Sequence, residues 1–243
     1  METPCEYLEW DSRFFGKRIA RVRGDRLEEA SVESVLRWCR ENRIEGLYFL
    51  AVPDDRRTLE LAEAHGFHLT DIRVSLEKHL HGPEVGPAPD LSGRIRPVSD
   101  PDRPALLALA QEAFRLGRFH YDSRISKESA DALYRAWLER CLEEAPQGVW
   151  VAEVGGKPAG FVASRREEGD WGRIELLALE LRHRGRGLGG ALLTTACREL
   201  QRENRAAKVR TVTQARNVAA LRAFHKNAFI VEGVRLWYHR WFP

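Results

Sequence analysis

The sequence predicts an α/β protein (an α+β arrangement with a mixed sheet), and three observations lead to this expectation. Short apolar runs alternate with segments of helical periodicity along residues 94–243. A strand-like run passes through a glycine-rich turn into a helix at residues 176–193. With 43% apolar and 31% charged residues, the chain has the balance of a protein that buries real cores rather than staying disordered.

A segment rich in Pro and Gly divides the chain. Residues 81–93 have no hydrophobic periodicity, so they are expected to form a linker between two domains. We therefore expect an N-terminal domain at residues 1–80 and a second domain at residues 94–243.

The apolar patterns place the elements of each part. In the second part we expect helices at 105–116, 128–143, 188–202 and 218–226, and strands at 94–99, 149–154, 158–165, 172–179, 209–213 and 229–241. In the first part we expect strands at 18–22, 46–52 and 67–77 and helices at 29–41 and 57–65.

The order of elements in the first part matches the end of the second part, which indicates a weak internal repeat. Leu59, Phe67 and Arg73 correspond to Leu221, Phe229 and Arg235, which lie 162 residues later in each case. This correspondence favours a duplicated half-domain. The first copy has no glycine-rich loop, so we expect no separate chemistry in it.

Composition argues against several classes of partner. The net charge of +3 gives no electrostatic case for nucleic acid. No apolar run approaches the roughly 18 residues of a membrane span. The four cysteines form no C-x-x-C pair, which predicts free thiols, no metal site and a cytoplasmic location.

The glycine-rich turn at residues 184–190 is a candidate phosphate site. N–H groups at a helix start converge on one point and carry partial positive charge. Gly187, Gly189 and Gly190 remove side chains that would hold a pyrophosphate away from the backbone. Arg184 and Arg186 can add charge-assisted hydrogen bonds.

Three interpretations of this turn compete: coenzyme A, a dinucleotide, or a tight turn without a ligand. The spacing Gly185-x-Gly187-x-x-Gly190 also matches the dinucleotide fingerprint, which requires an acidic residue at the end of the next strand. Gln214-Ala215-Arg216 follows that strand here. The fingerprint also belongs to the first βα unit of a parallel sheet, whereas several strands precede this turn. The sequence therefore favours coenzyme A over a dinucleotide.

The segment Arg184-Gly185-Arg186-Gly187-Leu188-Gly189 resembles the signature of the GNAT superfamily of acyl-CoA N-acyltransferases. The strand before it and Asn217-Val218-Ala219-Ala220-Leu221 after it resemble that family's surrounding elements. A narrower resemblance, at residues 8–16, 117–120 and 236–241, is to the dTDP-fucosamine acetyltransferase group. These resemblances imply a GNAT fold with a truncated GNAT-like N-terminal domain.

The resemblance also implies the reaction and its participants. Acetyl-CoA would be the cosubstrate, and the acceptor would be a small-molecule amine, in the narrower group a nucleotide-linked amino sugar. In the family, backbone N–H groups of the strand before the loop hold the acyl oxygen. The residues implied in acetyl-CoA binding are Leu177, Ala178, Leu179, Arg184, Gly185, Arg186, Gly187, Leu188, Gly189, Gly190, Asn217, Ala220 and Phe224.

The catalytic candidates follow from the same resemblance. Phe224 stands where most members carry a Tyr that protonates the leaving thiolate, so the usual general acid is missing. Tyr238 and His225 are fallback donors. Glu175 is the first carboxylate to consider as a base, and His120 lies in a loop that contacts acceptor in this family; for both, an ordinary solvent-exposed role stays open.

Other functions also remain open at this stage. The acceptor could be another small amine or a protein N-terminus. The missing Tyr also leaves room for a domain that binds acyl-CoA without turnover. The sequence leaves a homodimer open, and His183 and His239 are expected to be peripheral.

Overall fold

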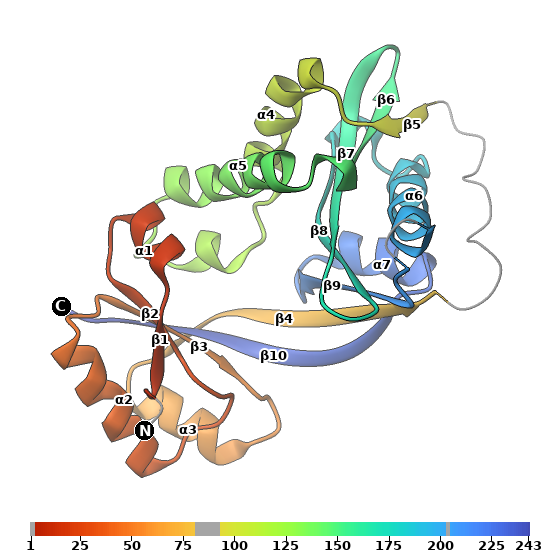
Figure 1. The fold of residues 1–243 in the computed structure, drawn as a ribbon. Helices are drawn as coiled ribbons and strands as arrows, with labels where there is room; N and C mark the ends of the chain where they lie inside the picture. Colours follow the sequence, from red (N-terminus) through yellow and green to blue (C-terminus); the bar gives the residue numbers. More distant parts are fainter. Residues whose placement is uncertain (1–2, 81–92, 203–204) are drawn as a thin grey trace.

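A computed structural model describes residues 3–80, 93–202 and 205–243 and places its strands in one continuous sheet (Figure 1). The sheet has 10 strands in the order β1-β2-β3-β10-β4-β9-β8-β7-β6-β5. It mixes parallel and antiparallel pairs, so the expected α/β class with a mixed sheet is confirmed. The predicted linker at residues 81–93 lies outside the described residues apart from Gly93.

The first half, residues 3–80, is built from seven elements. They are β1 Cys5–Tyr7, α1 Glu9–Phe15, β2 Ile19–Val22, α2 Glu29–Glu41, β3 Gly46–Ala51, α3 Arg56–Ala64 and β4 His68–His79. β1 and α1 were not expected from the sequence, because neither is long enough to show a hydrophobic period. The other elements lie within two residues of their expected bounds.

The second half, residues 93–243, holds the remaining elements. They are β5 Arg94–Pro97, η1 Asp100–Asp102, α4 Arg103–Ala113, η2 Arg118–Tyr121, α5 Lys127–Glu144, η3 Pro146–Gly148, β6 Val149–Val154, β7 Lys157–Arg166, β8 Trp171–Leu179, η4 Leu181–His183, α6 Leu188–Arg202, β9 Lys208–Gln214, α7 Val218–Lys226 and β10 Ile230–Trp241. The expected hairpin turn between β6 and β7 is present, with Gly155 and Gly156 at positive φ.

The two halves exchange their last strands, so neither half completes its sheet alone. β4 of the first half lies between β10 and β9, and β10 of the second half lies between β3 and β4 (Figure 1). Both strands run antiparallel to their neighbours over long registers. Each half therefore depends on the other for its backbone hydrogen bonds.

The segments of the internal repeat have the same local structure. α3 and α7 each end in a turn with one residue at positive φ, Gly66 at 72° and Ala228 at 61°. The bond from Phe67 N–H to Ala62 O recurs as the bond from Phe229 N–H to Phe224 O. Arg73 and Arg235, which correspond in the repeat, are paired directly across β4 and β10.

Helices cover both faces of the sheet. α6 and α7 bury one face of the second half, where the expected row Leu188, Leu192, Ala196 and Leu200 is at most 2% exposed. α4 and α5 bury the opposite face, and α1 and η2 extend that cluster to Tyr48 of the first half. Each fully buried Leu contributes about 1.5–3 kcal/mol, which fixes α6 beside the strands.

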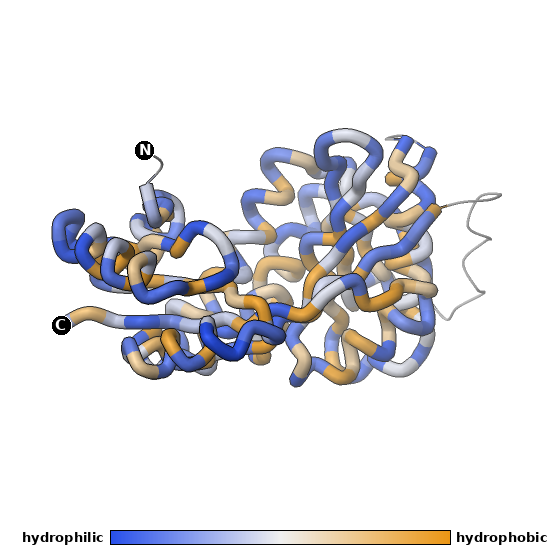
Figure 2. The backbone as a smooth tube through the Cα atoms, turned by 90° about the horizontal axis from the view of Figure 1, so that it is seen from below, coloured by the Kyte–Doolittle hydropathy of each residue, from blue (hydrophilic) through white to orange (hydrophobic). Residues whose placement is uncertain are grey.

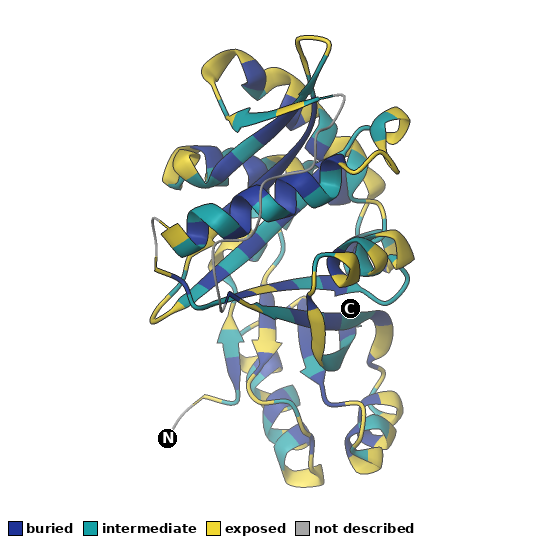
Figure 3. Ribbon diagram, turned by 90° about the vertical axis from the view of Figure 1, so that its right-hand side faces the viewer, coloured by how far each residue is buried: buried dark blue, intermediate teal, exposed yellow. Residues whose placement is uncertain are grey.

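A separate cluster under α2 and α3 stabilises the first half. Figure 2 shows hydrophobic stretches gathered in the interior of the chain trace, and Figure 3 shows the buried residues along the strands and the inward sides of the helices.

Candidate active site

β8 and β9 separate part-way along their length. Beyond this point, the backbone of β8 is not paired with β9. They pair in parallel only from Trp171 to Arg173, opposite Lys208–Arg210, while β8 continues to pair with β7 as far as Leu179. Glu180 N–H donates to Ala159 O across 2.9 Å. Because the direction of N–H groups alternates along an antiparallel strand, Leu177 and Leu179 direct theirs toward the opening, and Ala178 directs its own toward β7.

The glycine loop leads from this opening into α6. Gly185 and Gly187 have φ of 76° and 84°, a region that side-chain-bearing residues rarely adopt. Ala191 N–H makes the first i−4 bond, to Gly187 O at 3.0 Å, so residues 188–190 have no intrahelical acceptor for their N–H groups. Arg184 Nε donates to Leu179 O at 3.1 Å and ties the loop to the end of β8.

The loop has the chemistry that a pyrophosphate requires. The free N–H groups of a helix start favour an anion. A Cβ on Gly189 would come into van der Waals contact with Leu179 Cδ1 at 3.4 Å, the end of a flexible side chain. Arg184 and Arg186 of the same loop are exposed. The residues present therefore fit the pyrophosphate of coenzyme A.

α7 contributes the remaining residues implied in acetyl-CoA binding. Asn217 caps the helix, with its side-chain oxygen accepting from Ala220 N–H at 3.1 Å. Phe224 is 4% exposed and packs edge-on against Phe229 at 5.3 Å between ring centroids. The position of the usual Tyr is therefore occupied by an apolar ring in the core.

Glu175 is held by two donors and is not free in the described structure. Trp137 Nε1 donates to one carboxylate oxygen at 2.9 Å, and Arg165 Nε donates to the other at 2.6 Å. The side chain of Glu175 is 7% exposed. Glu175 therefore holds α5 against β8. Both of its carboxylate oxygens already accept hydrogen bonds, whereas a general base needs an oxygen that can accept a proton.

His120 has the arrangement that a general base requires. Its Nε2 lies 2.9 Å from Asp131 Oδ1, and Lys127 Nζ lies 2.5 Å from the other oxygen of Asp131. The ring is 9% exposed, and its Nδ1 is buried without a partner among the described residues. An oriented imidazole whose second nitrogen has no hydrogen-bond partner among the described residues can accept a proton.

His120 and Glu175 belong to one region of the molecule. The ring of Tyr134 is 6.2 Å from His120 and also 6.2 Å from Trp137, which binds Glu175. A row of stacked rings thus links the two candidate residues across α5.

The structure places Tyr238 and His225 elsewhere. Tyr238 is 3% exposed and lies in the core under α2 and α3. Its neighbour Trp237 packs with the cluster of α4 and α5, so Tyr238 faces away from that side of the sheet. His225 is exposed on α7. Neither is brought to His120 and Glu175.

Arg118, which sequence reasoning did not single out, is half-buried among aromatic rings. Its guanidinium carbon lies 4.3 Å from the Tyr48 ring, 4.2 Å from the Phe119 ring and 4.1 Å from the Trp237 ring. Burial lowers the pKa of Arg118. The aromatic neighbours come from both halves, so this residue marks the junction between them.

His239 was expected to be peripheral, and the structure corrects this. The ring is 1% exposed. Its Nδ1 lies 2.5 Å from Asp122 Oδ2, and its Nε2 lies 2.8 Å from Arg118 Nη1. Trp241 Nε1 also donates to Asp122 at 2.8 Å. Burial lowers the pKa of His239 to about 4. The exchange of β10 into the first half brings these residues together.

Asp71 and Arg216 form a second polar pair at the same junction. Burial raises the pKa of Asp71 to about 6, with Arg216 at 3.5 Å opposing the change. Arg216 lies 3.5 Å from the Tyr121 ring and donates to Thr70 O at 2.8 Å, while its Nη1 is buried without a partner in the described part of the chain. No local motif could reveal this pair, because β4 and the α7 entry are distant in sequence.

Two further properties of the described residues concern metal ions and membranes. Residues 3–80, 93–202 and 205–243 contain no group of three His, Cys, Asp or Glu arranged to hold a metal ion. Within the same ranges, no helix combines the length and the apolar character of a membrane span.

The family follows from a match that covers more than half of the sequence. Residues 104–229 match the acetyltransferase (GNAT) family. The chain belongs to this family. The range starts at α4 and ends just before β10, so it includes the strand opening, the glycine loop and α7. The resemblance seen in the sequence is thereby confirmed.

Two curated proteins are similar to this GNAT chain. Over 238 residues, 97% of both chains, it is 26% identical to a dTDP-fucosamine acetyltransferase of Escherichia coli O6:H1. Over 150 residues it is 25% identical to the spore coat polysaccharide biosynthesis protein SpsD of Bacillus subtilis. That second match spans 60% of this chain and half of SpsD.

Solved structures support the GNAT fold. A GCN5-related N-acetyltransferase from Sphaerobacter thermophilus superimposes with a TM-score of 0.71 at 18% identity, covering 98% of this chain and 76% of that one. A tandem GNAT protein from the clavulanic acid biosynthesis pathway superimposes with a TM-score of 0.62 at 17% identity, covering 94% and 77%. At these identities the similarity concerns the fold.

Proposed function

We propose that this protein transfers acetyl from acetyl-CoA to the amine of a nucleotide-linked amino sugar. The observation that carries the proposal is the opening between β8 and β9, which presents the N–H groups of Leu177 and Leu179 beside a glycine loop fitted to pyrophosphate. Buried polar side chains from both halves lie on the α5 face of the sheet.

The residues of the chain can perform acetyl transfer without a metal in the described site. The N–H groups of Leu177 and Leu179 are placed to hold the developing oxyanion as the amine nitrogen bonds to the acyl carbon. His120 Nδ1 accepts the amine proton, and Asp131 stabilises the imidazolium. The carbon–sulfur bond then breaks, and the thiol, with a pKa near roughly 8.5, departs largely as thiolate.

We assign the base to His120 rather than Glu175. Both oxygens of Glu175 accept hydrogen bonds, from Trp137 and Arg165, whereas Nδ1 of His120 has no partner among the described residues. In this proposal Glu175 is a positioning residue that holds α5 at the edge of the opening.

The acceptor class is supported by the relatives and by the two-part architecture. The Escherichia coli relative, which aligns along 97% of both chains, is named for acetylation of dTDP-fucosamine. The SpsD relative is named for the biosynthesis of a polysaccharide. The first half supplies Tyr48 and Asp71 to the junction with the catalytic half, and an acceptor with several recognition groups can use such a surface.

A thiol-release assay tests the proposal. Purified protein with acetyl-CoA is offered dTDP-fucosamine, glucosamine, a small alkyl amine and a peptide with a free N-terminus. We expect thiol release with the nucleotide sugar at a kcat/KM at least about tenfold above the others, because binding energy of the remote nucleotide contributes to the reaction. Faster release with the peptide or alkyl amine would contradict the acceptor class.

A second candidate function is acyl-CoA binding without turnover, and Phe224 is the observation that favours it. The residue leaves no hydroxyl where the family usually protonates the thiolate. Tight acetyl-CoA binding with no thiol release for any amine in the panel would support this alternative over the enzyme.

A further inference from the structure

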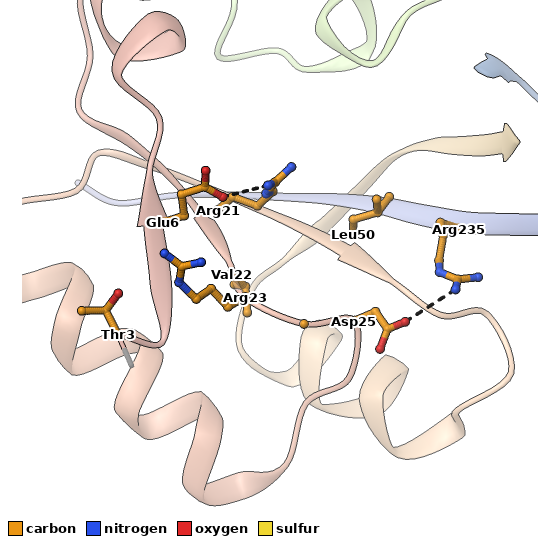
Figure 4. Close-up of a pocket in the computed structure, with 9 residues that line it drawn as sticks. Thr3, Glu6, Arg21, Val22, Arg23, Asp25, Leu50 and Arg235 are labelled. Atoms are coloured by element: carbon orange, nitrogen blue, oxygen red, sulfur yellow. Dashed lines mark hydrogen bonds and ion pairs between the residues drawn. The ribbon is translucent and has the colours of Figure 1, made fainter. Parts of the chain in front are cut away.

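A pocket of about 720 Å³ lies next to the end of β2, lined by residues of the first half and by Arg235 of β10 (Figure 4). Its charged walls come from Glu6, Arg21, Arg23, Asp25 and Arg235, and Leu50 gives it an apolar side. This volume lies within the roughly 300–1,000 Å³ of small-molecule sites. None of these residues belongs to the opening between β8 and β9.

The pocket occupies the position in the first half that the β8–β9 opening occupies in the second. β2 and β3 pair in parallel at Ile19–Arg21, as β8 and β9 do, and the pocket begins where that pairing ends. The helix that follows differs from α6. Glu28 is the N-cap residue of α2, and Glu29 lies in the first turn. These acidic groups already occupy the helix start, so it is unsuited to a pyrophosphate.

Arg235, which lines this pocket, has a second arginine as its cross-strand neighbour. Arg73 on β4 and Arg235 on β10 are directly opposite each other, so their side chains leave the same face of the sheet. Like charges at such a pair destabilise a sheet. Arg73 Nε is buried and has no partner among the described residues. Burial and the nearby charges of Arg173, Arg118, Arg21 and Arg235 lower the pKa of Arg73.

The ion pairs that the carboxylates of the pocket form are weak enough for an anionic ligand to replace them. Arg21 lies 2.7 Å from Glu6, and both side chains are more than 40% exposed. Arg235 lies 3.6 Å from Asp25, with side chains 40% and 46% exposed. Such exposed pairs contribute about 0–1 kcal/mol, so a multivalent anion can displace them. Planar guanidinium groups suit phosphate oxygens in particular.

We propose that this pocket, lined by Arg235 with Arg73 as its cross-strand neighbour, binds the diphosphate of the acceptor nucleotide sugar. The inference rests on the proposed function, because it identifies where that acceptor is held. β4 alone separates β10 from β9 in the sheet. Neighbouring strands are about 4.8 Å apart, so a diphosphate at Arg235 leaves about 10 Å to the edge of the β8–β9 opening. The terminal phosphate and the sugar ring together span this interval and carry the amine to the acetyl group.

Calorimetric titration with dTDP tests the site. The titrations use the full chain saturated with acetyl-CoA, in wild type, Arg235→Gln and Arg73→Gln. Arg37→Gln is the matched control, because it removes the same charge from an exposed position on α2. We expect dTDP to bind wild type and the control equally and each site variant about tenfold or more weakly, the loss typical of one charge-assisted hydrogen bond. Inorganic pyrophosphate should bind more weakly, with the same dependence on the arginines.

The outcomes separate the site from the function. Equal dTDP affinity in wild type and Arg235→Gln overturns the site, and the proposed function stands if wild type still acetylates the nucleotide sugar. If dTDP displaces acetyl-CoA, the nucleotide occupies the glycine loop and the inference is wrong. Absence of dTDP binding to wild type overturns the inference and the nucleotide acceptor together, while thiol release with another amine would leave acyl transfer intact. Arg235, at 40% exposure, keeps the test independent of any folding defect in Arg73→Gln.

Discussion

Arg118 donates Nη1–H to Nε2 of His239 across 2.8 Å, and this contact determines the protonation of the imidazole. A guanidinium has no acceptor atom, so Nε2 must be unprotonated and Nδ1 must donate to Asp122, 2.5 Å away. His239 is therefore neutral in the folded protein, as its lowered pKa of about 4 indicates. The result is a rigid polar unit between η2 and β10.

The neutral state of His239 predicts how stability depends on pH. Between its ordinary pKa of 6.5 and about 4, the unfolded chain binds a proton on this ring that the folded chain does not. Stability therefore falls as pH falls through this window, with a slope of up to roughly 1.4 kcal/mol per pH unit. We expect His239→Gln to remove this contribution from the free energy of unfolding measured in urea.

The measurement compares slopes, because other groups titrate in the same window. Asp71, whose pKa is raised to about 6, contributes in the opposite direction. The stability that protonated Asp71 provides to the folded protein is lost as pH rises. His225→Gln, at an exposed position on α7, should keep the wild-type slope. Parallel slopes for wild type and His239→Gln would show that His239 is charged in the folded state.

The assignment of His120 as base predicts a large loss of turnover on substitution. His120→Gln should lower kcat about 100-fold or more while leaving acetyl-CoA affinity unchanged. Asp131→Asn should lower kcat less, because the imidazole keeps its place while the amide no longer stabilises the imidazolium.

Glu175→Gln provides the comparison for this assignment. We expect it to lower the melting temperature, because Arg165 loses the nearer of its two carboxylate partners, with a smaller effect on kcat. A stable Glu175→Gln protein without turnover, next to a fully active His120→Gln protein, would move the base to Glu175.

Phe224→Tyr restores the hydroxyl that the family usually has. A donor with a pKa near about 10 beside the sulfur should raise kcat by about tenfold at most, and mainly at high pH, since thiolate already leaves well. Phe224 is 4% exposed, so an unpartnered hydroxyl there should cost about 1–3 kcal/mol of stability. We would measure kcat against pH beside a thermal melt; a normally melting variant with no gain at any pH would mean that protonation of the thiolate is not limiting.

The exchanged strands predict that the second half does not fold alone. A fragment of residues 94–243 lacks β4, which separates β10 from β9 and pairs with both. We expect it to be insoluble or to lack a cooperative thermal transition. Co-expression of residues 1–93 should restore solubility and the transition. A soluble fragment that acetylates the same amine with unchanged KM would show that the first half does not form the acceptor site.

Local pattern was sufficient to predict much of the fold. The bounds of α2, α6 and α7 match their expected residues because an apolar stripe with clear ends specifies a helix. The glycine loop could be predicted for the same reason, since its strand, positive-φ glycines and helix start are contiguous in sequence.

The sheet order and most of the junction could not be predicted in this way. β4 and β10 each have an ordinary strand pattern, and nothing in that pattern shows that each pairs within the other half. Arg118–His239 and Asp71–Arg216 are formed by this exchange, so their residues looked unremarkable in sequence. Tyr238 was misplaced because the face toward which a strand residue points depends on the register.

Calorimetry with Gly189→Asp tests most directly whether the glycine loop at the start of α6 binds acetyl-CoA. The added carboxylate lies where N–H groups should receive a phosphate, so we expect affinity to fall about 100-fold or more. Leu181→Asp is the matched control, because it adds the same charge at a 79% exposed site just outside the loop and should bind acetyl-CoA nearly as wild type does. Equal affinities for wild type and Gly189→Asp would remove the loop from the site and contradict the account.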